Sequence, residues 1–296
     1  MTYPRREFIK LGAALGAGMA LQPLAGCFSN KSAPQATGEG NLGAFGLQLY
    51  TLRDDMPKDP KGVLQKVASY GYKQIESYEH DQLGMFWGMS PQEFRTYLDG
   101  LGMAIVSSHC EINKDFERKV EQAASIGMAY LACPWLGPNP GLDFYRKAAE
   151  QFNRCGELCK KAGLRFAYHN HDYSFLPVEG QLPQDVMMQA TDPSLVDYEM
   201  DIYWVVVAGQ DPVEWFNKYP GRFTMSHVKD RRKGAKAKDT DASTVLGTGA
   251  LDFSTVLKAG ADKGMKYFIV EQERYDGTTP LKAVEANAAY MKSLKV

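Results

Sequence analysis

Short apolar runs alternate with longer amphipathic segments along most of the chain. The short runs are rich in Val, Ile, Phe and Tyr and predict buried β-strands, whereas segments with an apolar residue every three or four positions predict helices. Ser-Pro-Gln-Glu at 90–93 is a capping box with proline at the first helical position, and it marks the start of one such helix. The predicted strands are residues 45–50, 73–77, 104–108, 130–133, 164–169, 196–201, 223–227 and 266–271. The predicted helices are residues 59–69, 90–100, 142–162, 183–190, 252–263 and 280–294, with a further one beginning at Asp211.

This alternation of strand and helix predicts the fold class. Eight βα units in unbroken succession favour a closed parallel (β/α)8 TIM barrel over an open sheet. Residues 43–296 have the usual length of one such barrel. We therefore expect an α/β fold with a single domain over these residues.

The N-terminal segment predicts export rather than folding. Arg5 and Arg6 precede an Ala- and Gly-rich apolar run at 11–24, which resembles a twin-arginine signal. Leu-Ala-Gly-Cys at 24–27 resembles a lipoprotein processing site, so Cys27 would carry a lipid anchor. The run is short and weakly apolar for a spanning helix. We expect a signal peptide over 1–27, a flexible tether over 28–42, and a cell-envelope lipoprotein that faces the periplasm or the exterior.

Charge and cysteine content narrow the choice of function. The formal net charge is −1, and no basic stripe occurs outside the signal, which argues against a nucleic-acid partner. The positive segment at 231–238 is predicted to be a solvated loop. Four cysteines follow Cys27, and we expect buried free thiols because twin-arginine substrates usually fold before export.

Residues that can bind a metal stand where several predicted strands end. The carboxyl ends of barrel strands meet at one mouth, so these side chains should converge. A mixed set of imidazoles and carboxylates suits one divalent ion such as Mn²⁺, Co²⁺ or Zn²⁺ better than Ca²⁺. The residues at these ends are Glu76, His109, His169, His171, Asp201, His227, Glu271 and Glu273.

Strand alternation also places charged residues inside the barrel. Arg165 and Glu199 lie on adjacent predicted strands one layer below the mouth, and we expect them to form an ion pair because unpaired buried charges are costly. His109 is expected to pair with Glu111 and to contact a substrate. Aromatic residues follow two further strands and could form walls for a sugar ring, namely Trp135 and Trp204.

Five motifs at the strand ends resemble one known family. They are Gly-Leu-Gln-Leu-Tyr-Thr-Leu-Arg at 46–53, Tyr-His-Asn-His-Asp at 168–172, Met-Asp-Ile-Tyr-Trp at 200–204, His-Val-Lys-Asp at 227–230 and Val-Glu-Gln-Glu at 270–273. From residue 43 to its end the chain resembles the xylose isomerase-like barrels of sugar isomerases, epimerases and cyclitol dehydratases. The resemblance implies four metal ligands, one each from strands five to eight, in the order Glu, Asp, His and Glu. Asp201, His227 and Glu271 match the last three.

The fifth strand departs from the family pattern. Where the epimerases have a metal-binding glutamate, this chain has Ala167, and the nearest inward-facing replacements are His169 and His171. We expect His169 to be the fourth ligand. The epimerases use two glutamates to move a proton between the faces of a sugar, so the missing carboxylate argues against two-base epimerisation. The Tyr-His-x-His form instead resembles inosose dehydratase and barrels that cleave 3-keto-glycosides by elimination.

The chemistry of a metal-bound ketone points in the same direction. A cation that chelates a ketone and its neighbouring hydroxyl acidifies the α-hydrogen and stabilises an enediolate. Glu273 is the candidate base, and His109 or His171 is the candidate acid for the departing β-oxygen. Glu76 and Lys229 are expected, with the two tryptophans, to contact the substrate.

The sequence therefore predicts a metal-dependent lyase or dehydratase acting on a keto-sugar, keto-glycoside or keto-cyclitol. The alternative is a sugar isomerase or epimerase that uses the same metal. A nuclease of related fold would need several metals and a DNA-binding face, which the sequence does not offer. A sugar-binding lipoprotein without activity is opposed by the intact ligands Asp201, His227 and Glu271. No sequence feature defines an oligomeric state.

Overall fold

The computed structural model describes residues 42–296. The predicted signal peptide and the tether up to residue 41 lie outside the described residues, so both stay predictions. Between residues 42 and 296, none of the helices has the length and apolar character that a membrane span requires.

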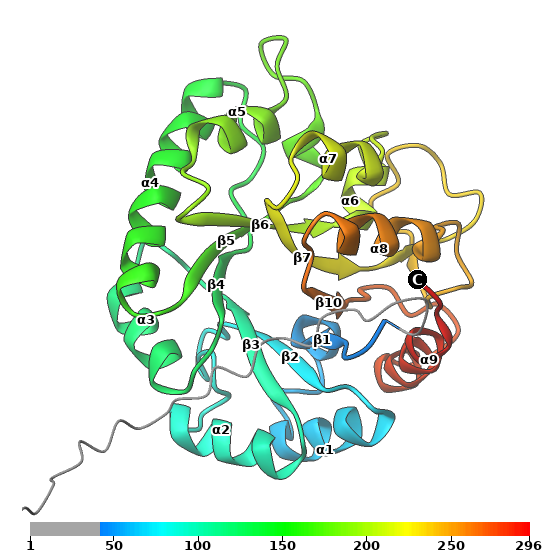
Figure 1. Ribbon diagram of the computed structural model, residues 1–296. Coiled ribbons are helices and arrows are strands. Elements are labelled where there is room, and N and C mark those ends of the chain that lie inside the picture. Colours follow the sequence, from blue (N-terminus) through cyan, green and yellow to red (C-terminus); the bar gives the residue numbers. More distant parts are fainter. Residues whose placement is uncertain (1–41) are drawn as a thin grey trace, which may run out of the picture. The chain divides into compact units, whose positions relative to one another are not determined.

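Eight parallel strands close into a barrel, which confirms the predicted fold class (Figure 1). Each strand pairs with its neighbours in chain order, and the last strand closes the ring against the first. The barrel strands are β1 (Gly46–Gln48), β2 (Gln74–Tyr78), β3 (Ala104–His109), β4 (Tyr130–Cys133), β5 (Arg165–His169), β6 (Val196–Asp201), β7 (Phe223–Val228) and β10 (Tyr267–Val270).

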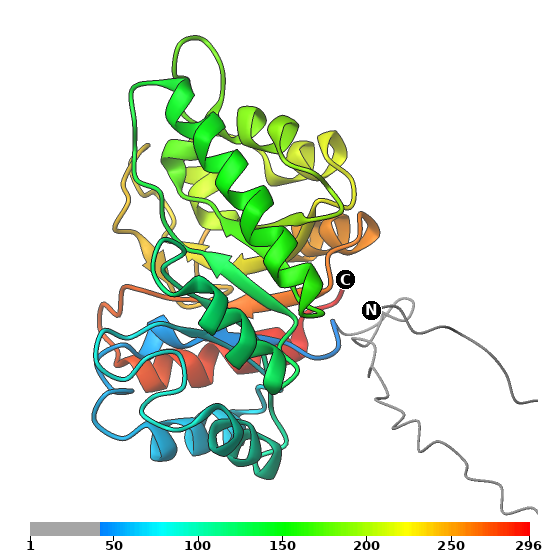
Figure 2. The ribbon, with the colours of Figure 1, turned by 90° about the vertical axis from the view of Figure 1, so that its left-hand side faces the viewer.

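The helices form a ring around the outside of the barrel, and Figure 2 shows the long α4 crossing the outer face of the strands. Apolar side chains between the strands and this ring make the main core. The helices are α1 (Pro60–Tyr70), α2 (Pro91–Gly100), α3 (Phe116–Ser125), α4 (Leu142–Lys161), α5 (Pro183–Ala190), α6 (Ile202–Val207), α7 (Pro212–Lys218), α8 (Phe253–Asp262) and α9 (Pro280–Ser293), with short 3-10 turns η1 (Leu49–Leu52) and η2 (Asp172–Phe175).

Two helices were missed from the sequence for identifiable reasons. Helix α3 is dominated by charged residues, so its apolar stripe is short. Helix α6 is an almost wholly apolar run directly after β6, and such a run resembles a continued strand. It turns helical because the Asp201 side chain accepts a hydrogen bond from the backbone N–H of Trp204, at 3.2 Å, and caps the first turn.

The predicted Arg165–Glu199 ion pair is wrong. The strand register sets Ala167 beside Asp197, so the inward-facing acid that Arg165 reaches is Asp197. The guanidinium Nη2 lies 2.7 Å from one oxygen of that carboxylate, and Nε contacts the other. Glu199 lies one layer nearer the mouth and is therefore available to the site.

The loop between β7 and α8 is folded around one buried carboxylate. It contains a short hairpin of β8 (Asp230–Arg231) and β9 (Ser243–Thr244). Asp230 accepts hydrogen bonds from four backbone N–H groups, of residues 231, 247, 249 and 251, at 2.7–3.2 Å. A side chain at Gly249 would lie 2.2 Å from an Asp230 oxygen, which explains the glycine. Most of the segment at 231–238 is exposed, and Arg232 pairs with Asp239 of the same loop and with Asp276 of the loop after β10.

Candidate metal centre and active-site cavity

The four residues predicted as metal ligands lie together at the barrel mouth. His169, Asp201, His227 and Glu271 each offer a nitrogen or oxygen atom, and these atoms all lie within 4.8 Å of one another. The four side chains are buried. Strand register produces this convergence, because Asp201 stands beside His227 where β6 and β7 end. The chain thus has a candidate site for one divalent ion.

Two atoms of this cluster are buried without a hydrogen-bond partner among the described residues. They are Nε2 of His169 and Oδ2 of Asp201, which lie 3.5 Å apart. The other ring nitrogen of His169, Nδ1, lies 3.2 Å from the carbonyl oxygen of Pro134. Since a carbonyl only accepts, Nδ1 is the donor and Nε2 turns a lone pair toward Asp201. Buried polar atoms are normally paired, so this arrangement fits a bound cation.

His227 is oriented by a buried glutamate behind it. Its Nε2 lies 2.7 Å from Oε1 of Glu76, and its Nδ1 lies 3.2 Å from Glu271 and 3.6 Å from Asp201. Burial would lower the pKa of His227, but the surrounding carboxylates raise it well above its usual value. Nδ1 is therefore the nitrogen that faces the candidate metal position.

Glu76, predicted as a substrate contact, lies behind His227 and is not among the residues that line the cavity. It is fully buried and accepts hydrogen bonds from Gln48, at 2.7 Å, and from Ser107 as well as from His227. Burial alone would raise the pKa of Glu76, but the imidazoles of His109 and His227 lower it to about 2. Glu76 is thus an ionised carboxylate that fixes the ring of His227.

His109 pairs with Glu199 rather than with Glu111. Its Nε2 lies 2.8 Å from Oε2 of Glu199, whereas Glu111 accepts hydrogen bonds from the backbone and side chain of Asn113. Burial lowers the pKa of His109 to about 3 and raises the pKa of Glu199 well above its usual range. With Glu76 and His227, these two residues form a second buried group beneath the candidate metal position.

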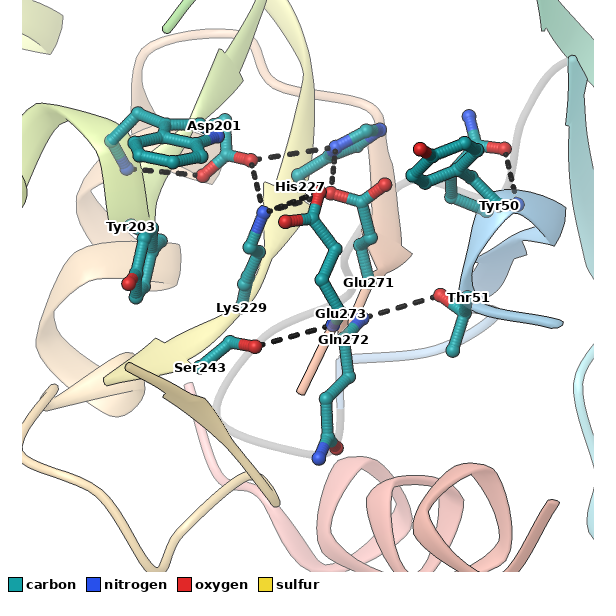
Figure 3. A network of polar contacts seen from close by, with 12 residues as sticks. Tyr50, Thr51, Asp201, Tyr203, His227, Lys229, Ser243, Glu271, Gln272 and Glu273 are labelled. Atoms are coloured by element: carbon teal, nitrogen blue, oxygen red, sulfur yellow. Dashed lines mark hydrogen bonds and ion pairs between the residues drawn. The ribbon is translucent and has the colours of Figure 1, made fainter. Parts of the chain in front are cut away.

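Lys229 lies between three carboxylates and is fully buried (Figure 3). Its Nζ is 3.2 Å from Glu271, 3.1 Å from Glu273 and 3.6 Å from Asp201. Burial would lower the pKa of Lys229, but these carboxylates raise it well above its usual value, so it remains an ammonium group. The ring of Trp204 covers the ammonium at 4.9 Å. Lys229, predicted as a substrate contact, is not among the residues that line the cavity, and its ammonium contacts Glu273, which does line it.

A cavity of about 700 Å³ opens over the cluster. His171 lies in its wall with the ring of Trp135 edge-on at 4.5 Å and that of Trp204 at 5.2 Å. Burial lowers the pKa of His171 well below its usual value, and its Nδ1 has no hydrogen-bond partner among residues 42–296. The residues predicted for the site that line the cavity are His109, Trp135, His169, His171, Trp204, Glu271 and Glu273.

The backbone around Glu273 is held by residues to which the sequence assigned no individual role, although Thr51 and Arg53 lie in the family motif at 46–53. The hydroxyl of Ser243 accepts hydrogen bonds from the N–H groups of Glu273, at 3.2 Å, and of Arg274, at 2.9 Å. Arg53 donates to the carbonyl oxygen of Glu273 at 3.1 Å, and Thr51 accepts from the N–H of Gln272 at 3.2 Å (Figure 3). The η1 turn and the β7–α8 loop therefore fix the candidate base from two sides.

Comparison with known proteins identifies the family. The family model described as xylose isomerase-like TIM barrel matches residues 64–294. The chain belongs to this family.

Relatives and solved structures agree with this assignment. An inosose dehydratase of Clostridium perfringens is 30% identical over 143 residues, covering 44% of this chain and 48% of that relative, so the chain spans about half of its length. The crystal structure of a sugar phosphate isomerase/epimerase from Parabacteroides distasonis has a TM-score of 0.71 and 29% identity, covering 87% of this chain and 95% of that one. The IolI protein with a binding zinc atom shares the fold at 16% identity with a TM-score of 0.68, covering 83% of this chain and 95% of that one.

Within this xylose isomerase-like barrel, the strand-five position that reaches the candidate metal is His169. Ala167 lies deeper, in a small inner cluster with Ala132 and Met225. The register sets Ala167 beside Asp197 and His169 beside Glu199. No carboxylate of β5 therefore reaches the ligand cluster, as the sequence predicted.

Proposed function

We propose that this protein is a metal-dependent lyase or dehydratase that acts on a keto-sugar, keto-glycoside or keto-cyclitol. The observation that carries the proposal is the cluster of His169, Asp201, His227 and Glu271, with two unpartnered buried atoms, beside a cavity lined by Glu273. The name of the inosose dehydratase relatives supports a dehydratase.

The ligand set fits a divalent transition metal. Two imidazole nitrogens and two carboxylates suit Mn²⁺, Co²⁺ or Zn²⁺. When bound, such an ion would polarise a substrate ketone and stabilise the negative charge of the enediolate that forms from it. The protein residues supply orientation and proton transfer.

Glu273 is the proposed base. Its carboxylate takes the α-hydrogen of the keto-substrate, and the electron pair of that C–H bond passes into the enediolate. The β C–O bond then breaks, its electron pair leaves with the oxygen, and the departing oxygen receives a proton. The products are an unsaturated ketone and water or an alcohol. Lys229, at 3.1 Å, holds the Glu273 carboxylate in place.

His171 is the better placed of the two candidate proton donors. The Nε2 atom of His109 is already engaged by Glu199 at 2.8 Å, whereas His171 stands in the cavity wall. As the acid, His171 passes an N–H proton to the departing oxygen, and its ring is reprotonated afterwards by the proton that Glu273 has taken or by solvent. His109 remains the alternative.

Incubation with candidate ketoses and keto-glycosides in D₂O tests the reaction. A lyase gives an unsaturated product, and chelator abolishes its formation. Glu271→Gln should lose metal and activity together, whereas Glu273→Gln should keep the metal and lose on the order of 10²-fold or more in rate. Full activity of Glu273→Gln would refute its assignment as the base.

Isomerisation or epimerisation of a sugar is the second candidate. The Parabacteroides distasonis structure named as a sugar phosphate isomerase/epimerase, at 29% identity over most of both chains, favours it. In D₂O this reaction returns a deuterated isomer of the substrate without an eliminated product. That outcome would replace the lyase proposal.

We also propose that the barrel is exported as an envelope lipoprotein, on the basis of Arg5, Arg6 and the Leu-Ala-Gly-Cys segment at 24–27. Replacing both arginines by lysine should leave unprocessed precursor in the cytoplasm. Cys27→Ala should abolish lipidation. Normal export and lipid labelling of these variants would refute the proposal.

A further inference from the structure

Two large aromatic side chains are exposed in the part of the chain that the structure describes, and both line the same cavity. Trp135 is 54% exposed and Tyr50 is 41% exposed. Exposed large apolar side chains that share one site indicate a binding surface, and aromatic rings are well suited to stack on other rings.

Both aromatic rings are held in place before any ligand binds. The indole of Trp135 contacts His171 and Tyr173 edge-on, with ring centroids 4.5 and 4.9 Å away. Tyr50 packs edge-on against Tyr78 at 5.3 Å, and the guanidinium of Arg53 covers its ring at 4.9 Å. Because their neighbours fix them, stacking a ligand on them costs little conformational entropy.

The cavity extends beyond the ligand cluster. Trp135 follows β4, and Tyr50 lies in η1 after β1, so the two rings approach the mouth from different sides of the barrel. The volume of about 700 Å³ lies in the upper half of the range of about 300–1,000 Å³ that is typical of small-molecule pockets. Residues of the β2 and β3 ends line the outer part, namely Tyr78, Glu79, His80, Asp81, Cys110, Glu111, Lys114 and Lys119.

The charge of the lining opposes an anionic ligand. Three carboxylates line the outer part, those of Glu79, Asp81 and Glu111, compared with two lysines. The other two lining carboxylates, Glu271 and Glu273, lie at the ligand cluster and contact Lys229. One of the two outer lysines, Lys119, is already neutralised by Glu79 at 2.7 Å and donates to the carbonyl oxygen of Glu111. A phosphate group in the outer part would meet mostly negative charge.

We propose that Trp135 and Tyr50 form an outer subsite for a second ring of an uncharged glycoside. This inference rests on the proposed function, because it places the reacting sugar ring at the ligand cluster. It selects a two-ring keto-glycoside over a keto-cyclitol or a sugar phosphate as the substrate class. The departing group of the elimination would then be the ring that stacks on the aromatic pair.

Binding of unreactive glycosides tests the subsite without turnover. The protein purified with its metal is titrated with methyl β-D-glucopyranoside, 4-nitrophenyl β-D-glucopyranoside, cellobiose and glucose 6-phosphate, by calorimetry or ligand-observed NMR. None of these compounds carries the ketone that elimination needs, so the result is independent of the proposed reaction. The variants are Trp135→Ala and Tyr50→Ala, with Trp135→Phe as the conservative change.

The two-ring ligands should bind more tightly than the methyl glycoside and the phosphate ester. Each alanine variant should weaken the binding of two-ring ligands about threefold to tenfold more than it weakens the binding of the methyl glycoside, a difference the size of one aromatic contact. Trp135→Phe should retain most of the additional affinity that the second ring provides. Tyr97→Ala, on α2 outside the cavity, is the matched control and should change nothing. Equal weakening of one-ring and two-ring ligands, no gain from a second ring, or tightest binding of glucose 6-phosphate would overturn the proposal.

Discussion

Glu76 and Glu199 offer a matched test of how the protein holds its candidate metal ligands. Both glutamates are fully buried, and both face Nε2 of His227, at 2.7 and 3.4 Å. They differ in charge, since the pKa of Glu76 is lowered to about 2 and that of Glu199 is raised well above its usual range. Burial and the charge of Glu76 favour the neutral form of Glu199, whereas Glu76 is a carboxylate at pH 7. Glutamine therefore removes a full charge at position 76 and much less charge at position 199.

The magnitude follows from the hydrogen bond that Glu76 makes. In Glu76→Gln the amide oxygen can still accept from His227, and the amide N–H₂ can donate to the hydroxyl of Ser107, so the geometry survives. The substitution removes the negative charge of the acceptor. A hydrogen bond to a charged group contributes about 1–1.5 kcal/mol more stabilisation than a bond between neutral groups. Since about 1.4 kcal/mol is tenfold in affinity, we expect metal binding to weaken about tenfold. This value lies at the lower end of the 10–100-fold range for residues that support metal ligands.

The assay is competition between the protein and a chelating indicator. Metal-free protein is titrated with Zn²⁺ and with Mn²⁺ at pH 7, and thermal unfolding verifies that each variant is folded. Glu199→Gln should bind within about threefold of the wild type, because a neutral group replaces a largely neutral group of similar shape. An equal loss of metal affinity in the two variants, or no loss of metal affinity in Glu76→Gln, would refute the assignment of charge to these residues.

Two further predictions concern the loop between β7 and α8 and the buried cysteine thiols. Asp230→Asn places an amide N–H₂ against backbone N–H groups, so it should lower the free energy of unfolding by about 1–3 kcal/mol in urea titrations and reduce turnover through the Ser243 contact with Glu273. A stability equal to the wild type would refute this account of the loop. Burial raises the pKa of Cys133 and of Cys155 to about 12, so both thiols stay protonated at pH 8. In a background that lacks Cys27 and the cavity-lining Cys110, a thiol reagent should label the protein only after denaturation, and rapid labelling of native protein would contradict the burial of the remaining thiols.

Much of the site could be predicted from the sequence because it depends on strand periodicity. Each metal-ligand candidate stands at the end of a predicted strand, and the carboxyl ends of parallel strands must meet, so Asp201, His227 and Glu271 were expected to converge. His169 was added to this set because alternate residues of β5 point into the barrel and His169 is one of them. The alternation of side chains shows which residues point inward, but it does not show how deep each residue lies along the barrel axis. That depth depends on how the neighbouring strands are shifted relative to one another when they pair. For this reason Arg165 was predicted to pair with Glu199, whereas it pairs with Asp197, which lies one layer deeper.

The supporting residues were harder to predict. Glu76 was predicted near a strand end like the ligands, but it lies in the middle of β2. The sequence does not show that β2 places its carboxylate behind His227 instead of in the cavity. Ser243 lies in a long polar loop whose course depends on the hydrogen bonds of Asp230. Contacts of this kind join segments that are far apart in the chain. They depend on side-chain geometry, which neither periodicity nor turn signals encode.

The charges at the mouth connect metal binding to the placement of the base. Oδ2 of Asp201 and Oε2 of Glu271 each face both Nδ1 of His227 and Nζ of Lys229. The raised pKa of His227 places a proton on its ring, and a metal can bind Nδ1 only by displacing a proton from that atom. A bound ion would supply the positive charge that Asp201 and Glu271 otherwise receive from His227. Lys229 keeps its contact with Glu273, so the same lysine that balances the ligand carboxylates also holds the proposed base over the cavity.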